Sequence, residues 1–141
     1  MLVKSVLYRA DATATAGRDT QVVSPEGALD LKVTMPPDLG GTNGRGTNPE
    51  QLFAATYAAS FLGMLRLVSA GEGLSLPGNT QVEASVGVGA IARGFGIEVE
   101  LRIQLPGMAR VEVDALVMRA HELCPYSNAT RNNVSVRLVI T

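Results

Sequence analysis

A long apolar segment with a complete helix-start signal constrains this chain more than any other feature. Thr47 or Asn48 can act as the N-cap, and Pro49 suits the first helical position because its missing N–H would be unpaired there. Glu50 then favours the positive end of the helix dipole. The segment predicts a helix over residues 49–68. Its side chains are apolar or small nearly all round, so we expect the helix to be buried on most sides.

The longest uncharged stretch of the chain covers residues 51–65 of this helix and is ended by Arg66. It includes polar and small residues and is too short to span a bilayer, which favours a buried helix. The N-terminal residues lack the apolar core of a signal peptide. We therefore expect a soluble, cytoplasmic protein without membrane contact.

The remaining patterns predict six strands and a second helix. The predicted strands are residues 2–16, 21–23, 29–35, 82–88, 96–105 and 134–141. The first three favour an N-terminal antiparallel sheet, and the next two favour a hairpin. The second helix is predicted over residues 108–123 and ends where Pro125 forbids its continuation.

The order of these elements contains no repeating βαβ unit. It predicts an α+β fold in one domain over residues 1–141, with antiparallel sheet wrapped around two largely buried helices. An apolar fraction of 46% supplies a core for a single domain of this length.

Composition excludes several kinds of partner. The net charge is −1, aromatic residues make up 4% of the chain, and Trp is absent. Neither a cationic phosphate-binding face nor a base-stacking platform is indicated, so we expect no nucleic acid partner. One Cys and one His fall short of the ligands that a zinc site needs, so we expect no metal.

The single cysteine, Cys124, cannot form an intramolecular disulfide. Its thiol is therefore reactive, metal-bound or an inert buried group. At the C-terminal end of the predicted second helix the dipole disfavours a thiolate. This position predicts a poor primary nucleophile and a better second thiol, one that attacks an already oxidised sulfur.

Two further polar residues have ordinary interpretations beside functional ones. Ser60 fits a small helical residue whose hydroxyl bonds back to a carbonyl, and the G-x-S-x-G elbow of a serine hydrolase is absent around it. His121 lies one turn before Cys124 and could act as its base, or it could be an exposed residue favoured at a helix C-terminus.

Arg18 and Glu50 can each be explained without a function. Arg18 fits a solvated turn residue, and Glu50 fits a carboxylate favoured in a first helical turn. The glycine-rich residues 39–46 lack the Gly-Lys-Ser/Thr ending of a phosphate-binding loop, so we expect an ordinary loop there.

Four segments, read together, resemble the organic hydroperoxide resistance (Ohr) proteins, a branch of the OsmC-like superfamily. They are TATAGRD at residues 13–19, GTNPEQLFAA at 46–55, GFG at 94–96, and AH followed by CPYSNATR within 120–131. The second and fourth segments are long and specific, and the likeness covers nearly the whole chain.

The resemblance implies a role for four residues. The family's peroxidatic cysteine lies in a Tyr-x-Ala-Cys-Phe pattern, which matches residues 57–61 here and places Ser60 at the cysteine position. Cys124 matches the resolving cysteine, Arg18 the arginine that stabilises the thiolate, and Glu50 the carboxylate that orients this arginine.

The resemblance also implies the reaction. The peroxidatic thiolate reduces an organic hydroperoxide to an alcohol, the resolving thiol closes a disulfide, and a dithiol such as dihydrolipoamide on a lipoylated protein reduces it again. No bound cofactor is implied. The apolar lining supplied by helix residues such as Phe61 should favour bulky organic peroxides over hydrogen peroxide. With Ser60 in place of the attacking sulfur, we expect no turnover.

We interpret Ser60 as a deliberate Cys→Ser replacement, with two alternatives. One is a naturally non-catalytic relative that binds an apolar fatty-acid or peroxide ligand, and the other is a one-cysteine peroxidase that uses Cys124. Ten helical residues rise roughly 15 Å, so Glu50 and Ser60 of one straight helix cannot both touch one small site. Either Arg18 spans part of this gap or a second subunit supplies Glu50, and the family precedent of an intertwined homodimer suits the second option.

Overall fold

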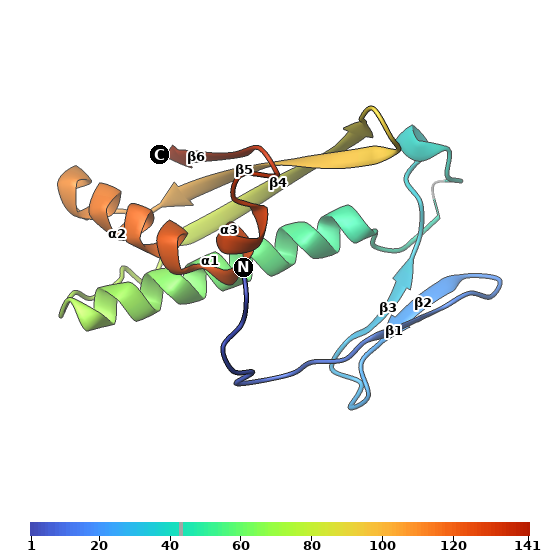
Figure 1. Cartoon of the computed structure of the whole chain (residues 1–141), viewed down its shortest axis with the longest axis horizontal. Helices are drawn as coiled ribbons and strands as arrows, with labels where there is room; N and C mark the ends of the chain where they lie inside the picture. The colour runs from blue at the N-terminus through green and yellow to red at the C-terminus, as the bar shows by residue number, and fades with distance from the viewer. Residues whose placement is uncertain (43) are drawn as a thin grey trace. The chain divides into compact units, whose positions relative to one another are not determined.

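The computed structural model describes residues 1–42 and 44–141. The chain forms two compact units, Met1–Leu52 and Phe53–Thr141. Asn43, in the glycine-rich loop predicted over residues 39–46, lies outside the described residues. The elements in chain order are β1 (Thr13–Thr15), β2 (Thr20–Val23), β3 (Asp30–Val33), η1 (Pro37–Leu39), α1 (Pro49–Gly71), β4 (Gln81–Ala90), β5 (Phe95–Gln104), α2 (Arg110–Leu123), α3 (Pro125–Thr130) and β6 (Val136–Ile140) (Figure 1).

The first unit contains the predicted antiparallel sheet, in the order β1-β2-β3. Val22 of β2 lies opposite Ala14 of β1 and Leu31 of β3. After β3 the chain makes one 3-10 turn, η1, and an isolated parallel bridge then joins Val33 to Thr47. The bridge leads the chain directly into α1.

The first predicted strand is mostly wrong. Of residues 2–16, only Thr13–Thr15 form a strand. Residues 1–20 are all exposed, including Leu2 and Leu7, whose side chains are 96% and 97% accessible. A β-branched, apolar pattern becomes a strand only where a neighbouring strand or a core covers it, and none of the described residues of the single chain covers this segment.

Local signals place the start of α1 as predicted. Asn48 is the cap: its Oδ1 accepts a hydrogen bond from the backbone N–H of Gln51 at 2.8 Å, and Pro49 occupies the first helical position. The helix continues three residues beyond the predicted end, to Gly71. Gly73 then takes a positive φ of 70°, a conformation that favours glycine after a helix.

α1 is long and apolar enough to cross a membrane, judged by length and composition alone. The core helix of a soluble protein passes the same test. In this structure Tyr57, Phe61 and Leu65, spaced four residues apart, are fully buried in the core of the second unit, so one stripe of α1 packs in the core. The expectation that the helix is buried on most sides is wrong for the single chain, because only Val68 and Ser69 join these three residues as buried.

The second unit contains a three-stranded sheet in the order β4-β5-β6. β4 and β5 form the predicted hairpin, closed by a hydrogen bond from the Ile91 N–H to the Gly94 carbonyl. β6, however, pairs with β5 in parallel, whereas antiparallel sheet was predicted. Parallel neighbours need a crossover connection, and the helical segment between β5 and β6 provides it.

Two helical predictions need correction. α2 begins at Arg110 rather than residue 108, and a third helix, α3, follows at Pro125. Pro125 was predicted to end a helix, and it does, but proline also suits the first position of the next one. The α+β class is confirmed, with three α-helices among the described residues instead of two. The prediction of one domain over residues 1–141 stays a prediction.

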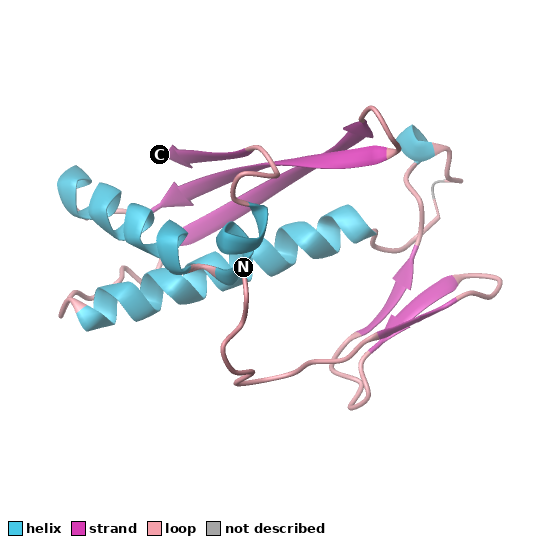
Figure 2. Cartoon of the chain, viewed as in Figure 1, coloured by secondary structure: helices cyan, strands magenta, loops and turns pink. Residues whose placement is uncertain are grey.

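The helices α1, α2 and α3 lie to one side of the β4-β5-β6 sheet (Figure 2). β5 alternates between its two faces: Val99, Leu101 and Ile103 are buried in the core, whereas Glu100 and Arg102 point away from it. The fully buried members of the core from the helices and from the α2–α3 corner are Tyr57, Phe61, Leu65, Leu116, Val117, Ala120 and Cys124.

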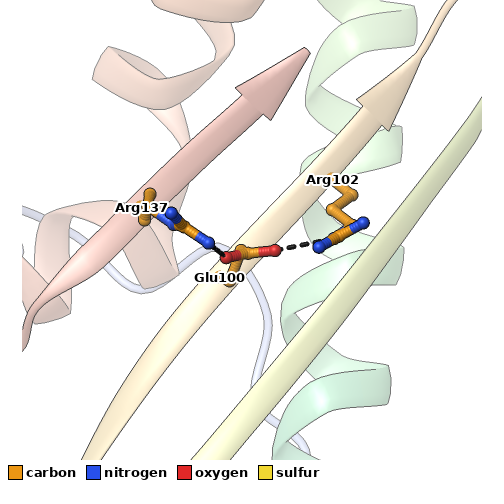
Figure 3. Close-up of polar contacts among 3 residues, drawn as sticks. All are labelled: Glu100, Arg102 and Arg137. Atoms are coloured by element: carbon orange, nitrogen blue, oxygen red, sulfur yellow. Dashed lines mark hydrogen bonds and ion pairs between the residues drawn. The ribbon is translucent and has the colours of Figure 1, made fainter. Parts of the chain in front are cut away.

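Glu100 lies on the outer face of the sheet between two arginines (Figure 3). Arg102 donates from Nε to Glu100 Oε1 at 2.6 Å, and Arg137 of β6 donates to the other carboxylate oxygen. The hydrogen bonds from Arg137 and Arg102 lower the pKa of Glu100 below its ordinary value. These charges keep the outer face polar.

Candidate active site

The structure brings Ser60 and Cys124 together, although 64 positions separate them in the sequence. Ser60 Oγ lies 3.8 Å from Cys124 Sγ, within hydrogen-bond range for sulfur. The hydroxyl of Ser60 therefore faces the thiol. The ordinary interpretation, a hydroxyl bonded back to its own helix, does not describe the contact that it makes.

The core stripe of α1 positions Ser60. Tyr57 and Phe61 are fully buried on this helix, and Ser60 lies three residues after the first and directly before the second. Residues three or four apart share a helix face, so Ser60 lies at the edge of the buried stripe and is half-buried. Phe61 is fully buried in the core of the second unit, and the expectation that it lines a substrate pocket stays a prediction.

Cys124 occupies the corner between α2 and α3 and is fully buried. Its N–H donates to the Ala120 carbonyl at 2.8 Å, which ends α2, and its carbonyl accepts from the Asn128 N–H at 2.9 Å, which begins α3. The negative end of one helix and the positive end of the next thus meet at this residue. The α2 dipole therefore does not act alone on Cys124, and the expectation that Cys124 is a poor primary nucleophile stays a prediction.

A chain of polar side chains runs beside Cys124. The Tyr57 hydroxyl lies 2.7 Å from Ser127 Oγ, which in turn lies 2.8 Å from His121 Nδ1. Tyr57 and Ser127 are fully buried and His121 is half-buried, so the interpretation of His121 as an exposed residue is wrong. Its partner is Ser127; among residues 1–42 and 44–141 no hydrogen bond joins it to Cys124.

Sequence reasoning missed Ser127 and Tyr57 as members of this chain. The signal that could have found Ser127 is the three-residue spacing from His121 to Cys124 and from Cys124 to Ser127. Tyr57 lies 70 positions from Ser127, and no local pattern announces such a contact.

Arg131 fixes the end of α2 to the end of α3. Its Nη2 donates to the His121 carbonyl at 2.8 Å, and its Nη1 donates to Asn128 Oδ1. Burial of the imidazole, and next the positive charge of Arg131, lower the pKa of His121 from its usual 6.5. The imidazole is therefore neutral near neutral pH.

Arg18 and Glu50 lie in the first unit. Arg18 is exposed in the turn between β1 and β2, where its neighbour Asp19 pairs with Lys32 at 3.3 Å. Glu50 is half-buried in the first turn of α1 and borders a cavity of about 220 Å³. Within the described part of the chain no ion pair joins Arg18 to Glu50, so the orienting role of Glu50 stays a prediction.

Nothing in the described residues groups three or more His, Cys, Asp or Glu side chains in a way that could hold a metal ion. In the second unit the structure brings together Ser60 and Cys124, and next to Cys124 in the sequence the side chains of His121 and Ser127 are hydrogen-bonded to each other and to Tyr57.

This fold and this pair of positions define a class of protein. The OsmC-like protein family matches residues 41–139, and the chain belongs to this family. Within the family it belongs with the organic hydroperoxide resistance proteins. It is 55% identical over 137 residues to the organic hydroperoxide resistance protein of Xanthomonas axonopodis pv. citri, covering 97% of this chain and 96% of the relative.

Solved structures of organic hydroperoxide resistance proteins have the same fold as this chain. An organic hydroperoxide resistance protein from Elizabethkingia anophelis superposes with a TM-score of 0.92 at 46% identity, covering 99% of each chain. One from Legionella pneumophila gives a TM-score of 0.90 at 41% identity, covering 97% of this chain and 99% of that one.

Proposed function

We propose that this protein is the scaffold of a thiol-dependent organic hydroperoxide reductase whose attacking position is occupied by Ser60. The observation that carries the proposal is the 3.8 Å approach of Ser60 Oγ to Cys124 Sγ. A sulfur at position 60 would lie within reach of a second sulfur. Membership among the organic hydroperoxide resistance proteins supports organic hydroperoxides as the substrates.

The proposed cycle has three steps. A thiolate at position 60 attacks the distal peroxide oxygen, the O–O bond breaks, and the substrate leaves as an alcohol after taking a proton. The sulfenic acid formed at position 60 is then attacked by the Cys124 thiol, which closes a disulfide and releases water. A dithiol such as dihydrolipoamide on a lipoylated protein reduces this disulfide and becomes oxidised itself.

Two residues of the first unit complete the proposal. Arg18 would stabilise the thiolate and the negative charge that moves onto the departing oxygen, and Glu50 would hold the guanidinium in one orientation. Both assignments rest on the family resemblance. We also propose a cytoplasmic location, where thiols are kept reduced.

Ser60 should make this form inactive. An alkyl hydroxyl stays protonated near neutral pH, and oxygen has no counterpart of the sulfenic acid that the cycle requires. Cys124 alone lacks a resolving partner and is fully buried, so it should not replace the missing nucleophile.

We further propose that the active form is a homodimer. Glu50 and Ser60 lie ten residues apart on α1, and an α-helix rises about 15 Å over that length. The N-terminal segment exposes several large apolar side chains, among them Leu2, Leu7 and Tyr8, which a second subunit could cover. A concentration-independent monomer in sedimentation would contradict this assembly.

The test is dihydrolipoamide oxidation driven by an organic hydroperoxide, run on this protein and on its Ser60→Cys variant. We expect turnover only in the variant, and the Ser60→Cys, Cys124→Ala double variant serves as the matched control without a resolving thiol. If neither the Ser60 protein nor the Ser60→Cys variant turns over, a non-catalytic protein that binds an apolar ligand becomes the better hypothesis. Turnover by both would identify Cys124 as an attacking thiol.

A further inference from the structure

The hydrogen-bonded chain Tyr57–Ser127–His121 has no role in the cycle proposed above. It joins one residue from each of three helices: Tyr57 from α1, Ser127 from α3 and His121 from α2. Figure 1 shows α3 next to α1, and the hydrogen bond between Ser127 and Tyr57 joins these two helices. Two of its three members are fully buried, so the hydrogen bonds cannot be replaced by water without a change in packing.

The three hydrogen-bonded residues lie three positions from Ser60 or from Cys124 in the sequence. His121 precedes Cys124 by three residues and Ser127 follows it by three, whereas Tyr57 precedes Ser60 by three on α1. The hydrogen bond between Ser127 and Tyr57 thus holds the α2–α3 corner against α1. Because Cys124 lies on that corner, the same contact sets the distance from Cys124 Sγ to Ser60 Oγ.

The number of protons shared by Tyr57, Ser127 and His121 decides whether each of their hydroxyl groups has a hydrogen-bond acceptor. When His121 is neutral with its proton on Nε2, Ser127 donates to Nδ1 and Tyr57 donates to Ser127, so both hydroxyl protons are used. When the imidazole is protonated, three protons compete for two hydrogen bonds. In the part of the protein that the structure describes, the side chain of Tyr57 bonds only to Ser127, and the side chain of Ser127 bonds only to Tyr57 and His121. One buried O–H therefore loses its acceptor when the imidazole is protonated.

We propose that His121 is a positioning residue for Cys124: it acts through Ser127 and Tyr57 to hold the thiol against position 60, and it releases the corner when its imidazole gains a proton. This inference rests on the proposed function only for its consequence, which is control of disulfide closure. The positioning of Cys124 itself does not depend on the proposed function, because it applies to the protein with Ser60.

The surroundings of His121 support the neutral state as the resting one. Arg131, which follows α3, donates to the His121 carbonyl and repels a second positive charge. Glu122, the adjacent residue on α2, is paired with Arg119 at 2.9 Å. The titratable groups that approach from α1 and from the corner are Tyr57, through Ser127, and Cys124. Burial and Arg131 both lower the pKa of the imidazole.

The test uses the fact that the chain has one histidine and one cysteine. NMR of the single imidazole gives its tautomer and its titration midpoint, and reaction with dipyridyl disulfide gives the accessibility of the single thiol. Near neutral pH we expect the Nε2–H tautomer and a slowly reacting thiol. As pH falls through the His121 midpoint, the rate constant for the thiol, corrected for its thiolate fraction, should rise about tenfold, the change expected for one lost hydrogen bond.

Four variants separate positioning from general damage to the fold. His121→Ala and Ser127→Ala should react at the faster rate at every pH. His121→Asn, whose Oδ1 can accept from Ser127 but does not titrate, should stay slow with no step. Tyr57→Phe keeps the buried ring but removes the hydrogen bond to Ser127, so it should react at the faster rate at every pH. A step that persists in His121→Asn, or an unchanged rate in both alanine variants, would overturn the proposal.

A last measurement distinguishes this inference from the proposed function. In the Ser60→Cys background, His121→Ala should slow disulfide closure after a single peroxide addition, while leaving sulfenic acid formation unchanged. If Ser60→Cys forms no sulfenic acid but Cys124 accessibility still follows His121, the proposed reaction fails and the positioning role holds. If the cycle runs and His121→Ala closes the disulfide as fast as the parent, the positioning role fails alone.

Discussion

Oxidation of the Ser60→Cys variant should form a disulfide between positions 60 and 124 and raise the free energy of unfolding measurably. The two positions are 64 residues apart in sequence, and 3.8 Å separates Oγ from Sγ in the Ser60 form. For a loop of this length the chain-entropy relation gives about 4 kcal/mol of stabilisation at 25 °C. A disulfide needs its sulfurs about 2.05 Å apart, so any strain incurred while the side chains close this gap subtracts from that value.

The assay is urea unfolding of the oxidised and the dithiol-reduced variant at one fixed protein concentration, because dimerisation would make the unfolding free energy depend on concentration. Mass spectrometry verifies the bond by the loss of two hydrogens. Ser60→Ala, carried through the same oxidation, should show no difference. If the bond forms and the free energy of unfolding does not rise, or if mild oxidation leaves both thiols free, the inferred geometry of the pair is wrong.

Three further outcomes follow from single residues. Asn48→Ala removes the side-chain cap of α1 and should lower the free energy of unfolding by about 1 kcal/mol in urea unfolding, and Asn48→Asp should restore most of it. Phe61→Ala empties a fully buried position and should cost about 3–5 kcal/mol, whereas Phe61→Leu should cost far less in the same assay. Because the folded pKa of His121 is lowered, the unfolded chain binds a proton first, so stability should fall as pH drops below about 6.5 and level off below the folded pKa. His121→Asn should remove this pH dependence from a series of unfolding curves, and an unchanged slope would contradict the assignment.

What the sequence predicts well is what neighbouring residues decide. The start of α1 follows from Asn48, Pro49 and Glu50, which lie next to one another, and the hairpin of β4 and β5 follows from alternation around a short turn. The end of α2 at Leu123, two residues before Pro125, has the same local origin. Each of these features agrees with the structure to within a few residues.

What the sequence predicts poorly depends on partners distant in the chain. The parallel pairing of β6 with β5 joins Val136 to Val99, and no local pattern distinguishes it from an antiparallel pairing. The failure of the first strand is of the same kind, because exposed apolar residues need a neighbour to pair with. The approach of Ser60 to Cys124 was implied only through the family resemblance, since neither residue type nor spacing predicts it.

Access, rather than the helix dipole, separates the roles of the two positions. Because α3 begins where α2 ends, Cys124 lies at the ends of two opposed helix dipoles. The dipole of α2 alone therefore does not make Cys124 a poorer attacking thiol than a cysteine at position 60. Burial does rank them: Ser60 is half-buried at the edge of the α1 stripe, whereas Cys124 is fully buried behind it. A peroxide arriving from solvent would meet position 60 first, and only a sulfur already held at position 60 lies close to Cys124. The order of attack and resolution in the proposed cycle therefore has a geometric reason that the sequence could not supply.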